Sequence, residues 1–118
     1  MAEYVRKSGT RELVDVAAGH GTSMQVLVGS EEAPNFALRK FIMEPHGGMP
    51  KHTNSVEHEQ YVVRGSGTIE IANKAYEIVA GDSVFIPSNV PHSYVAGKDG
   101  LEFICVIPNK EDNIKLVE

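Results

Sequence analysis

Three histidines and one asparagine are spaced so that their side chains can act together. His52 and Asn54 are two residues apart, so both side chains leave the same face of an extended strand. His58 is a further even step along and precedes an apolar run at residues 61–63 that predicts the next strand. A later segment can supply one more imidazole from His92. Imidazole and amide groups on one face of a β-structure suggest a metal site.

Alternation along the strands predicts which neighbours share that face. Gln60 and Tyr94 each lie two residues from one of the histidines, so both are expected to point inward, where an amide or a phenol can orient a ligand. Glu57 and Glu59 point the other way by parity, which favours surface ion pairs over ligation.

Arg39 has two possible placements. It shares a strand face with Ala37 and Phe41. If that face lines a barrel, Arg39 is a buried cation able to bind a substrate carboxylate. Otherwise its side chain is solvated. The two remaining histidines, His20 and His46, are assigned to loops.

The composition is that of an ordinary globular protein. At 118 residues, with 42% hydrophobic and 23% charged residues, residues 1–118 are expected to form a single domain. A net charge of -5 without a basic stripe argues against nucleic acid as a partner. No apolar run suits a membrane span or a secretory signal, so we expect a cytoplasmic protein with no membrane partner. The one cysteine excludes an intramolecular disulfide.

Short strands divided by turns account for most of the chain, which indicates an antiparallel sandwich or barrel. Several strands are apolar on both faces, so we expect a homodimer, with the N-terminal segment packing on its partner. The tail at 110–118 is expected to form one helical turn or an edge strand. Strands are expected at residues 11–18, 23–29, 36–43, 61–64, 68–72, 75–79, 83–86, 92–96 and 101–107, with turns at 19–22, 44–48, 73–74 and 97–100.

The first His-bearing motif resembles that of the cupin superfamily, which reads Gly, five residues, His-x-His, three or four residues, Glu, six residues, Gly. Gly47 fits if four residues are allowed before His52. Asn54 stands where the second His is expected, and His58 stands where Glu is expected. Gly65 closes the motif in register.

The second cupin motif reads Gly, five residues, Pro-x-Gly, two residues, His, three residues, Asn. Gly81, Pro87 and His92 match its spacing, whereas Asn89 replaces the glycine and Ala96 the asparagine. The resemblance implies an all-β, double-stranded β-helix (cupin or jelly-roll barrel) with a metal inside. The barrel would cover about residues 23–108, after an N-terminal arm (1–22) and before a C-terminal tail (109–118).

A closer resemblance is to small prokaryotic cupins that carry His in place of the Glu ligand and often hold manganese or another first-row divalent ion. The phrases APNFALRKF, EHEQYVVRGSG and EFICVIP carry it. Ligand positions then fall on His52, His58 and His92, with Asn54 on the fourth, where a neutral amide is a weaker ligand than imidazole. Cys105 is either a small buried hydrophobe or, as this subgroup suggests, a thiol near the metal.

A site of three imidazoles without a carboxylate leaves a bound divalent ion its full charge and open positions. Mn, Fe, Ni, Cu and Zn all tolerate such ligands. We therefore expect a metal-dependent enzyme, of oxygenase or isomerase type, that acts on a small polar or anionic molecule. The alternative is a non-catalytic module that binds or senses a metal or small ligand. Asn54 in place of His, and the lack of an inward carboxylate base, favour that alternative.

Overall fold

The computed structural model describes residues 4–7 and 9–117. All the regular structure in them is β-strand, and these residues therefore include no helix that could cross a membrane. The strands are β1 (Val14–Asp15), β2 (His20–Val28), β3 (Phe36–Thr53), β4 (His58–Ile71), β5 (Lys74–Val79), β6 (Ser83–Ile86), β7 (His92–Pro108) and β8 (Lys115–Leu116).

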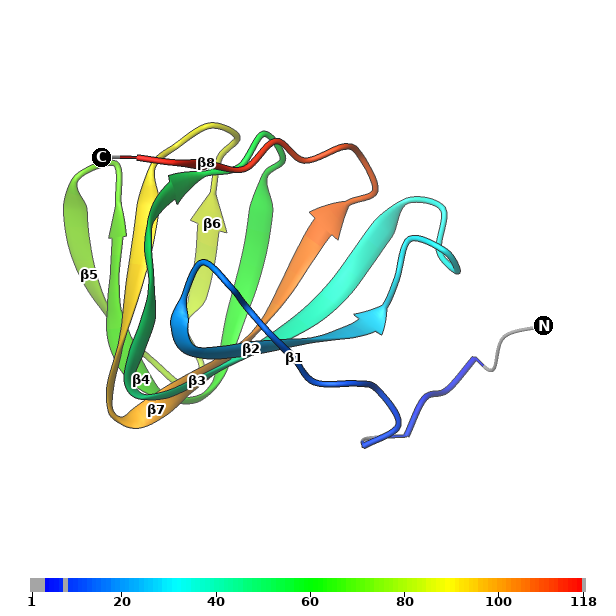
Figure 1. Cartoon of the computed structure of the whole chain (residues 1–118), viewed down its shortest axis with the longest axis horizontal. Coiled ribbons are helices and arrows are strands. Elements are labelled where there is room, and N and C mark those ends of the chain that lie inside the picture. Colours follow the sequence, from blue (N-terminus) through cyan, green and yellow to red (C-terminus); the bar gives the residue numbers. More distant parts are fainter. Residues whose placement is uncertain (1–3, 8, 118) are drawn as a thin grey trace.

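The strands pair antiparallel in the order β1-β2-β3-β7-β4-β5, with β6 added to β4 and β8 added to β3. The long strands β3, β4 and β7 each contribute to both halves of the structure. β4, for example, pairs with β6 near its start and with β5 near its end. The sheet thereby curls over on itself and encloses an interior, which confirms the predicted all-β barrel (Figure 1).

Gly65 in β4 has a positive φ of +83°, at a point where the pairing with β7 shifts register. A Cβ atom at this position would lie 2.1 Å from the carbonyl oxygen of Gly100 in β7, so a larger residue has no space. Gly100 also has a positive φ, of +82°, which glycine adopts without steric cost. The predicted turn at 97–100 is wrong, because β7 runs through these residues and its pairing with β4 resumes on both sides, after a register shift.

The predicted break at 44–48 is also wrong, because β3 continues through it. The pairing of β3 with β7 shifts register between Met43 and Gly48, and His46 takes a positive φ of +63°. This irregularity bends the strand while its pairing resumes on the far side. Sequence signals for a chain break and for a bent strand are the same, since glycine permits both.

The hairpin between β4 and β5 turns at Ala72-Asn73, one residue earlier than predicted. Both residues have positive φ, +51° and +68°, as a two-residue type I′ turn requires. The N–H of Ala72 donates to the carbonyl of Pro91 at 3.0 Å. That contact helps to hold alanine in a conformation that its side chain disfavours.

The two ends of the chain also differ from the expectations. Residues 11–18 contribute only β1, and the predicted turn at 19–22 is mostly part of β2. Of the two alternatives for the tail, an edge strand is correct. Lys115 and Leu116 in β8 pair with the end of β3, at Thr53 and His52.

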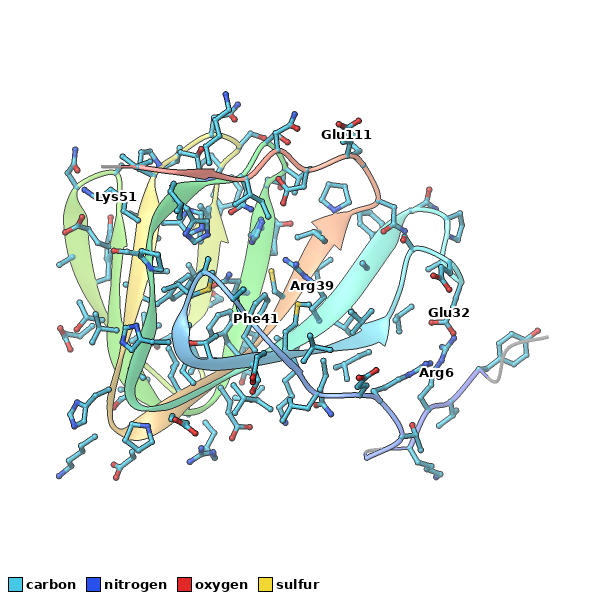
Figure 2. All side chains as sticks on the ribbon, viewed as in Figure 1. Arg6, Glu32, Arg39, Phe41, Lys51 and Glu111 are labelled. Carbon is cyan, nitrogen blue, oxygen red and sulfur yellow. The ribbon has the colours of Figure 1, made fainter. Side chains whose placement is uncertain are left out.

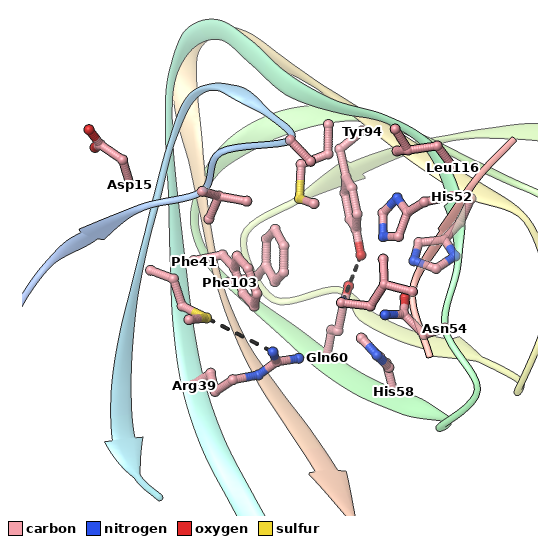
Figure 3. Close-up of a pocket in the computed structure, with 16 residues that line it drawn as sticks. Asp15, Arg39, Phe41, His52, Asn54, His58, Gln60, Tyr94, Phe103 and Leu116 are labelled. Carbon is pink, nitrogen blue, oxygen red and sulfur yellow. Dashed lines mark hydrogen bonds between the residues drawn. The ribbon is translucent and has the colours of Figure 1, made fainter. Parts of the chain in front are cut away.

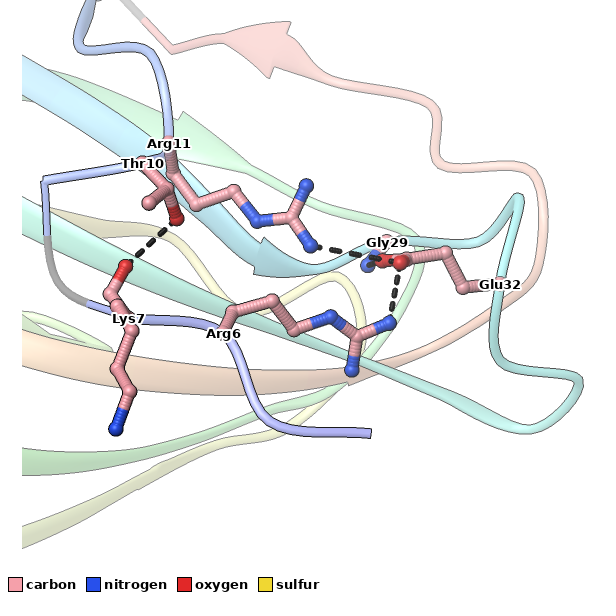
Figure 4. A network of polar contacts seen from close by, with 6 residues as sticks. All are labelled: Arg6, Lys7, Thr10, Arg11, Gly29 and Glu32. Atoms are coloured by element: carbon pink, nitrogen blue, oxygen red, sulfur yellow. Dashed lines mark hydrogen bonds and ion pairs between the residues drawn. The ribbon is translucent and has the colours of Figure 1, made fainter. Parts of the chain in front are cut away.

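The N-terminal segment is fastened to the loop after β2 through Glu32. Arg6 and Arg11 both form ion pairs with Oε1 of this carboxylate, and Arg11 lies 3.4 Å from it. The second oxygen, Oε2, accepts the N–H of Gly29 at 3.2 Å. These contacts join the N-terminal segment to the loop after β2 (Figure 4).

The core fills the interior between the two halves of the sheet. Arg39 and Phe41 extend from β3 toward this interior, whereas Lys51 and Glu111 lie at its periphery (Figure 2). On the outer face Tyr61 and Phe85 remain exposed. The most deeply buried side chains are Met43, Val62, Ile69, Ile86, His92, Leu101, Phe103 and Cys105.

Candidate functional site

The four side chains at the predicted ligand positions are buried around one cavity of about 240 Å³ (Figure 3). His52, near the end of β3, pairs in register with His92 at the start of β7, and their rings are 4.3 Å apart between centroids. His58 begins β4, and its ring centroid is 6.0 Å from that of His92. Asn54 follows directly after β3. Strand pairing thus brings together residues that are up to forty positions apart.

Two of the imidazoles are held in a defined tautomer. Nδ1 of His52 lies 2.8 Å from the carbonyl oxygen of Pro50, and Nδ1 of His92 lies 2.9 Å from that of Val90. A carbonyl oxygen only accepts, so each Nδ1 carries the proton and donates it. In the neutral ring the other nitrogen, Nε2, is left with a free lone pair, the arrangement usual in histidines that bind metals.

Three side-chain atoms of the site that could bind a metal lack a hydrogen-bond partner among the described residues. They are Nε2 of His58, Nε2 of His92 and Oδ1 of Asn54, all of them fully buried. Leaving a buried polar atom unsatisfied costs about 1–3 kcal/mol, so native structures contain few of them. Three in one cavity indicate that this cavity is built to receive a ligand with complementary atoms.

The amide of Asn54 has a fixed orientation because Asp112 holds it. Nδ2 of Asn54 donates to Oδ2 of Asp112 at 2.9 Å, and the N–H of Ser55 donates to Oδ1 at 2.9 Å. A carboxylate accepts only, so the NH₂ group must face Asp112 and Oδ1 must face away. Sequence reasoning missed Asp112. It lies in an irregular polar tail, and no spacing pattern links it to the motifs.

Gln60 and Tyr94 point inward, as alternation predicted. Nε2 of Gln60 donates to the phenol oxygen of Tyr94 at 2.7 Å, and both side chains are buried. Burial raises the pKa of Tyr94 well above its usual value, although the hydrogen bond from Gln60 acts in the opposite direction. The phenol of Tyr94 therefore stays protonated and can act as a hydrogen-bond donor, not as a base.

Cys105 lies behind His58. Its Sγ is 3.4 Å from Nδ1 of His58, and the residue is fully buried. Burial also raises the pKa of this thiol, so it remains neutral in the folded protein.

Arg39 lines the cavity directly. Glu57 and Glu59 are exposed, and His20 and His46 are exposed strand residues rather than loop residues.

Burial keeps the imidazoles of His58 and His92 neutral. The pKa of His58 falls to about 4, mainly through loss of hydration and also through the nearby guanidinium of Arg39. The pKa of His92 falls to about 4 for the same main reason, partly offset by its hydrogen bond to Val90. At neutral pH both rings are therefore uncharged and carry a single proton, which is the state that binds a metal.

The donor atoms suit a divalent ion in kind and in protonation. In the described part of the chain, no three His, Cys, Asp or Glu side chains are grouped closely enough to hold an ion, so His52, His58 and His92 do not form such a group by themselves. The amide of Asn54 belongs to none of those residue types and would have to complete the site. The fit of the site to a metal therefore rests on its unpartnered nitrogen and oxygen atoms and their tautomers.

Apolar side chains form most of the remaining cavity wall. Sequence reasoning missed these residues, because an inward apolar residue has the same alternation whether it packs in the core or lines a cavity. Ile114 and Leu116 reach the cavity from the tail, with Leu116 fixed by the pairing of β8 with β3. The other apolar lining residues are Val16, Ala18, Met24, Phe41, Met49 and Phe103.

The chain has clear relatives among known families and solved structures. The model of the cupin domain family matches residues 39–107. The polyketide cyclase RemF from Streptomyces resistomycificus is 27% identical, with a TM-score of 0.89 over 100% of this chain and 87% of that one. A cupin-2 domain from Rhodospirillum rubrum is 20% identical, with a TM-score of 0.84 over 100% of this chain and 82% of that one.

More distant likenesses show the same fold. An oxalate decarboxylase variant from Bacillus subtilis is 21% identical, with a TM-score of 0.74 over 84% of this chain and 27% of that one. No curated protein sequence matches the chain. The family match covers more than half of the chain, including all the strand pairs around the cavity except those of β1, β2 and β8. The chain therefore belongs to the cupin family.

Proposed function

We propose that this cupin is a metal-dependent enzyme that binds one divalent transition-metal ion through His52, His58 and His92, with Asn54 as the fourth donor. The observation that carries the proposal is the set of three buried, unpartnered donor atoms on His58, His92 and Asn54. The carbonyl contacts of His52 and His92 support it. Because Nδ1 of each ring donates its proton to a carbonyl, the lone pair of Nε2 is left available to a metal.

The chemistry that suits this donor set is polarisation of an oxygen-bearing substrate. Three imidazoles and an amide are neutral, so a bound divalent ion would keep its full charge and act as a Lewis acid, or activate dioxygen if it is redox-active. The phenol of Tyr94, held by Gln60, can donate a hydrogen bond to a substrate oxygen. The apolar wall excludes water from the reacting groups.

The relatives support an enzyme over other cupin roles. The structure that is 27% identical is a polyketide cyclase, and a polyketide carries several carbonyl groups. We infer that the substrate of this chain also presents a carbonyl or hydroxyl oxygen to the site and reacts by isomerisation, cyclisation or oxygenation. Manganese, iron, nickel, copper and zinc are all compatible with the ligands.

A non-catalytic binding module is the second candidate. It is favoured by one observation: among the described lining residues the only carboxylate is that of Asp15, whose side chain is largely exposed. A reaction that starts by removing a proton needs a base within hydrogen-bond reach of the substrate.

Titration of the protein with metal tests the proposal. Protein purified without added metal and then stripped with a chelator is expected to bind one equivalent of Mn²⁺, Ni²⁺ or Zn²⁺ and to unfold at a higher temperature once loaded. A ligand that binds only the folded state at about 100 times its Kd adds about 2.7 kcal/mol to the free energy of unfolding. Binding of less than about a tenth of an equivalent of every one of these ions would contradict the proposed metal site.

Asp112→Asn tests the role assigned to Asn54. Asparagine has one acceptor oxygen for the two N–H groups that Asp112 accepts from Asn54 and Ser55, so the orientation of the Asn54 amide is no longer fixed. We therefore expect metal affinity to fall by about 10- to 100-fold, as for other groups that orient a ligand. The measurement is isothermal titration of the metal-free protein. Glu111→Gln is the matched control, because this neighbouring carboxylate is exposed and changes the net charge equally. Equal affinity in both variants would mean that Asn54 is not a ligand.

A further inference from the structure

Arg39 is a cation in the cavity without an anion beside it. Among the described residues no carboxylate forms an ion pair with it. Its Nη1 lies 3.9 Å from Sδ of Met24, and its Nη2 lies 3.7 Å from Sγ of Cys105. Its Nε is buried without any partner. Sulfur atoms are weak acceptors, so most of the hydrogen-bonding capacity of this guanidinium is unused.

The guanidinium is joined to the histidines by two routes. Sγ of Cys105 contacts both Nη2 of Arg39 and Nδ1 of His58, so a single sulfur atom separates the two side chains. Along the cavity wall, the guanidinium lies 5.0 Å from the ring centre of Phe41, which stacks on Phe103. Phe103 in turn stacks on Tyr94. A row of aromatic rings therefore runs from Arg39 to the histidine end (Figure 3).

We propose that Arg39 binds the carboxylate of a small planar acid, whose body packs along Phe41, Phe103 and Tyr94 with its far end toward the histidines. This assignment names the substrate class for the site proposed above, but the anion contact does not require a metal. A guanidinium presents two parallel N–H groups that match the two oxygens of a carboxylate.

Charge and size both favour a carboxylic acid over a phosphate ester. Arg39 is the only Lys or Arg among the described lining residues, so in the metal-free protein one positive charge is available and a monoanion balances it. In that metal-free cavity a phosphate dianion would leave excess negative charge among apolar side chains, which is costly. The volume of about 240 Å³ is below that of sites for drug-sized ligands, and it suits a molecule about the size of benzoate.

Benzoate and its neutral analogue benzamide serve as probes. Binding is measured by titration calorimetry and by protein NMR shifts, on both the chelator-treated and the Zn²⁺-loaded protein. We expect benzoate to bind both forms at millimolar concentration or better, and benzamide to bind more weakly. In Arg39→Met, benzoate affinity should fall about tenfold or more, while benzamide affinity stays the same. Arg39→Lys should give an intermediate loss, because it keeps the charge but not the paired N–H groups.

Lys40→Met is the matched control. Lys40 is the next residue along β3, its side chain faces the opposite side and pairs with Glu102 at 3.2 Å, and its loss changes the net charge equally. Benzoate affinity should be unchanged in this variant, and circular dichroism checks that each variant is folded.

The inference is overturned if Arg39→Met binds benzoate as the parent does, if Lys40→Met loses affinity equally, or if the parent binds no benzoate. It is also overturned if only the Zn²⁺-loaded protein binds benzoate and Arg39→Met does not alter that binding. Failure of Zn²⁺ binding alone would count against the metal proposal and leave this one standing.

Discussion

His58→Ala is expected to lower the affinity for Mn²⁺ or Zn²⁺ by at least about 100-fold, since loss of a ligand costs no less than loss of a group that orients one. Nε2 of His58 is buried and has no partner among the described residues, so no protein group competes with a metal for it. In the variant the remaining donors are two imidazoles and one neutral amide, a weaker ligand set than three imidazoles and an amide. Metal content after purification and calorimetric titration of the stripped protein both measure the effect.

Two further variants separate ligation from packing. His58 is 5% exposed and packs against Cys105, so truncation to alanine also leaves a cavity that destabilises the fold. His58→Gln keeps most of the volume and a hydrogen-bonding end, and it should lose metal affinity with a smaller change in thermal stability. His20→Ala removes an exposed histidine outside the site and should keep the parent affinity. Full metal occupancy in His58→Gln would show that the ligand set is assigned wrongly.

The sequence predicted the relative placement of the three histidines better than the bounds of the strands that carry them. Motif spacing places His52, His58 and His92 on a common interior, and each is buried in the same cavity. Asn89 shows why a motif can tolerate a substitution. It stands in place of the motif glycine with a φ of +64°, a conformation that asparagine accepts more readily than other residues with a side chain.

The strand bounds were predicted less well because glycine is ambiguous. Gly65 and Gly100 were interpreted as ends of strands, yet both lie inside long strands whose pairing shifts register nearby and then continues. A strand that crosses from one half of a barrel to the other needs such a residue at the bend. Local sequence cannot distinguish a bend from an end, since the difference lies in which strand pairs on the far side.

Contacts from the tail were beyond sequence reasoning for a different reason. Asp112 and Leu116 belong to a segment without strong periodicity, and pairing of β8 with the end of β3 brings them to the cavity. Arg39 was open between an interior and a solvated position. Its place beside Phe41 and Cys105 follows from the register between β3 and β7, in which Arg39 pairs with Cys105. Tertiary pairing, rather than composition, decided these positions.

The metal-free protein is expected to lose stability steeply on mild acidification, from about pH 6.5 down to about pH 4. His58 and His92 have pKa values of about 4 in the folded state, whereas a histidine in an unfolded chain titrates near 6.5. Above the higher value neither state binds the protons, and stability is fully present. Between the two values only the unfolded state binds them, so acid favours unfolding. Below the lower value both states bind them, and the loss stops growing.

The size of this loss is large compared with the total stability of a small domain. Each such histidine contributes a slope of about 1.4 kcal/mol per pH unit across that window. Two of them therefore remove several kcal/mol, out of about 5–15 kcal/mol for a typical domain. Urea unfolding of the chelator-treated protein at about pH 7 and about pH 5 measures this loss of stability above the pH range where most carboxylates titrate.

The single variant His58→Gln should show roughly half the slope, and the double variant with His58→Gln and His92→Gln should show almost none. His20→Ala should behave as the parent. Equal stability of the parent at both pH values would mean that the two imidazoles are hydrated, and the site would then lack the buried, neutral donors on which metal binding depends.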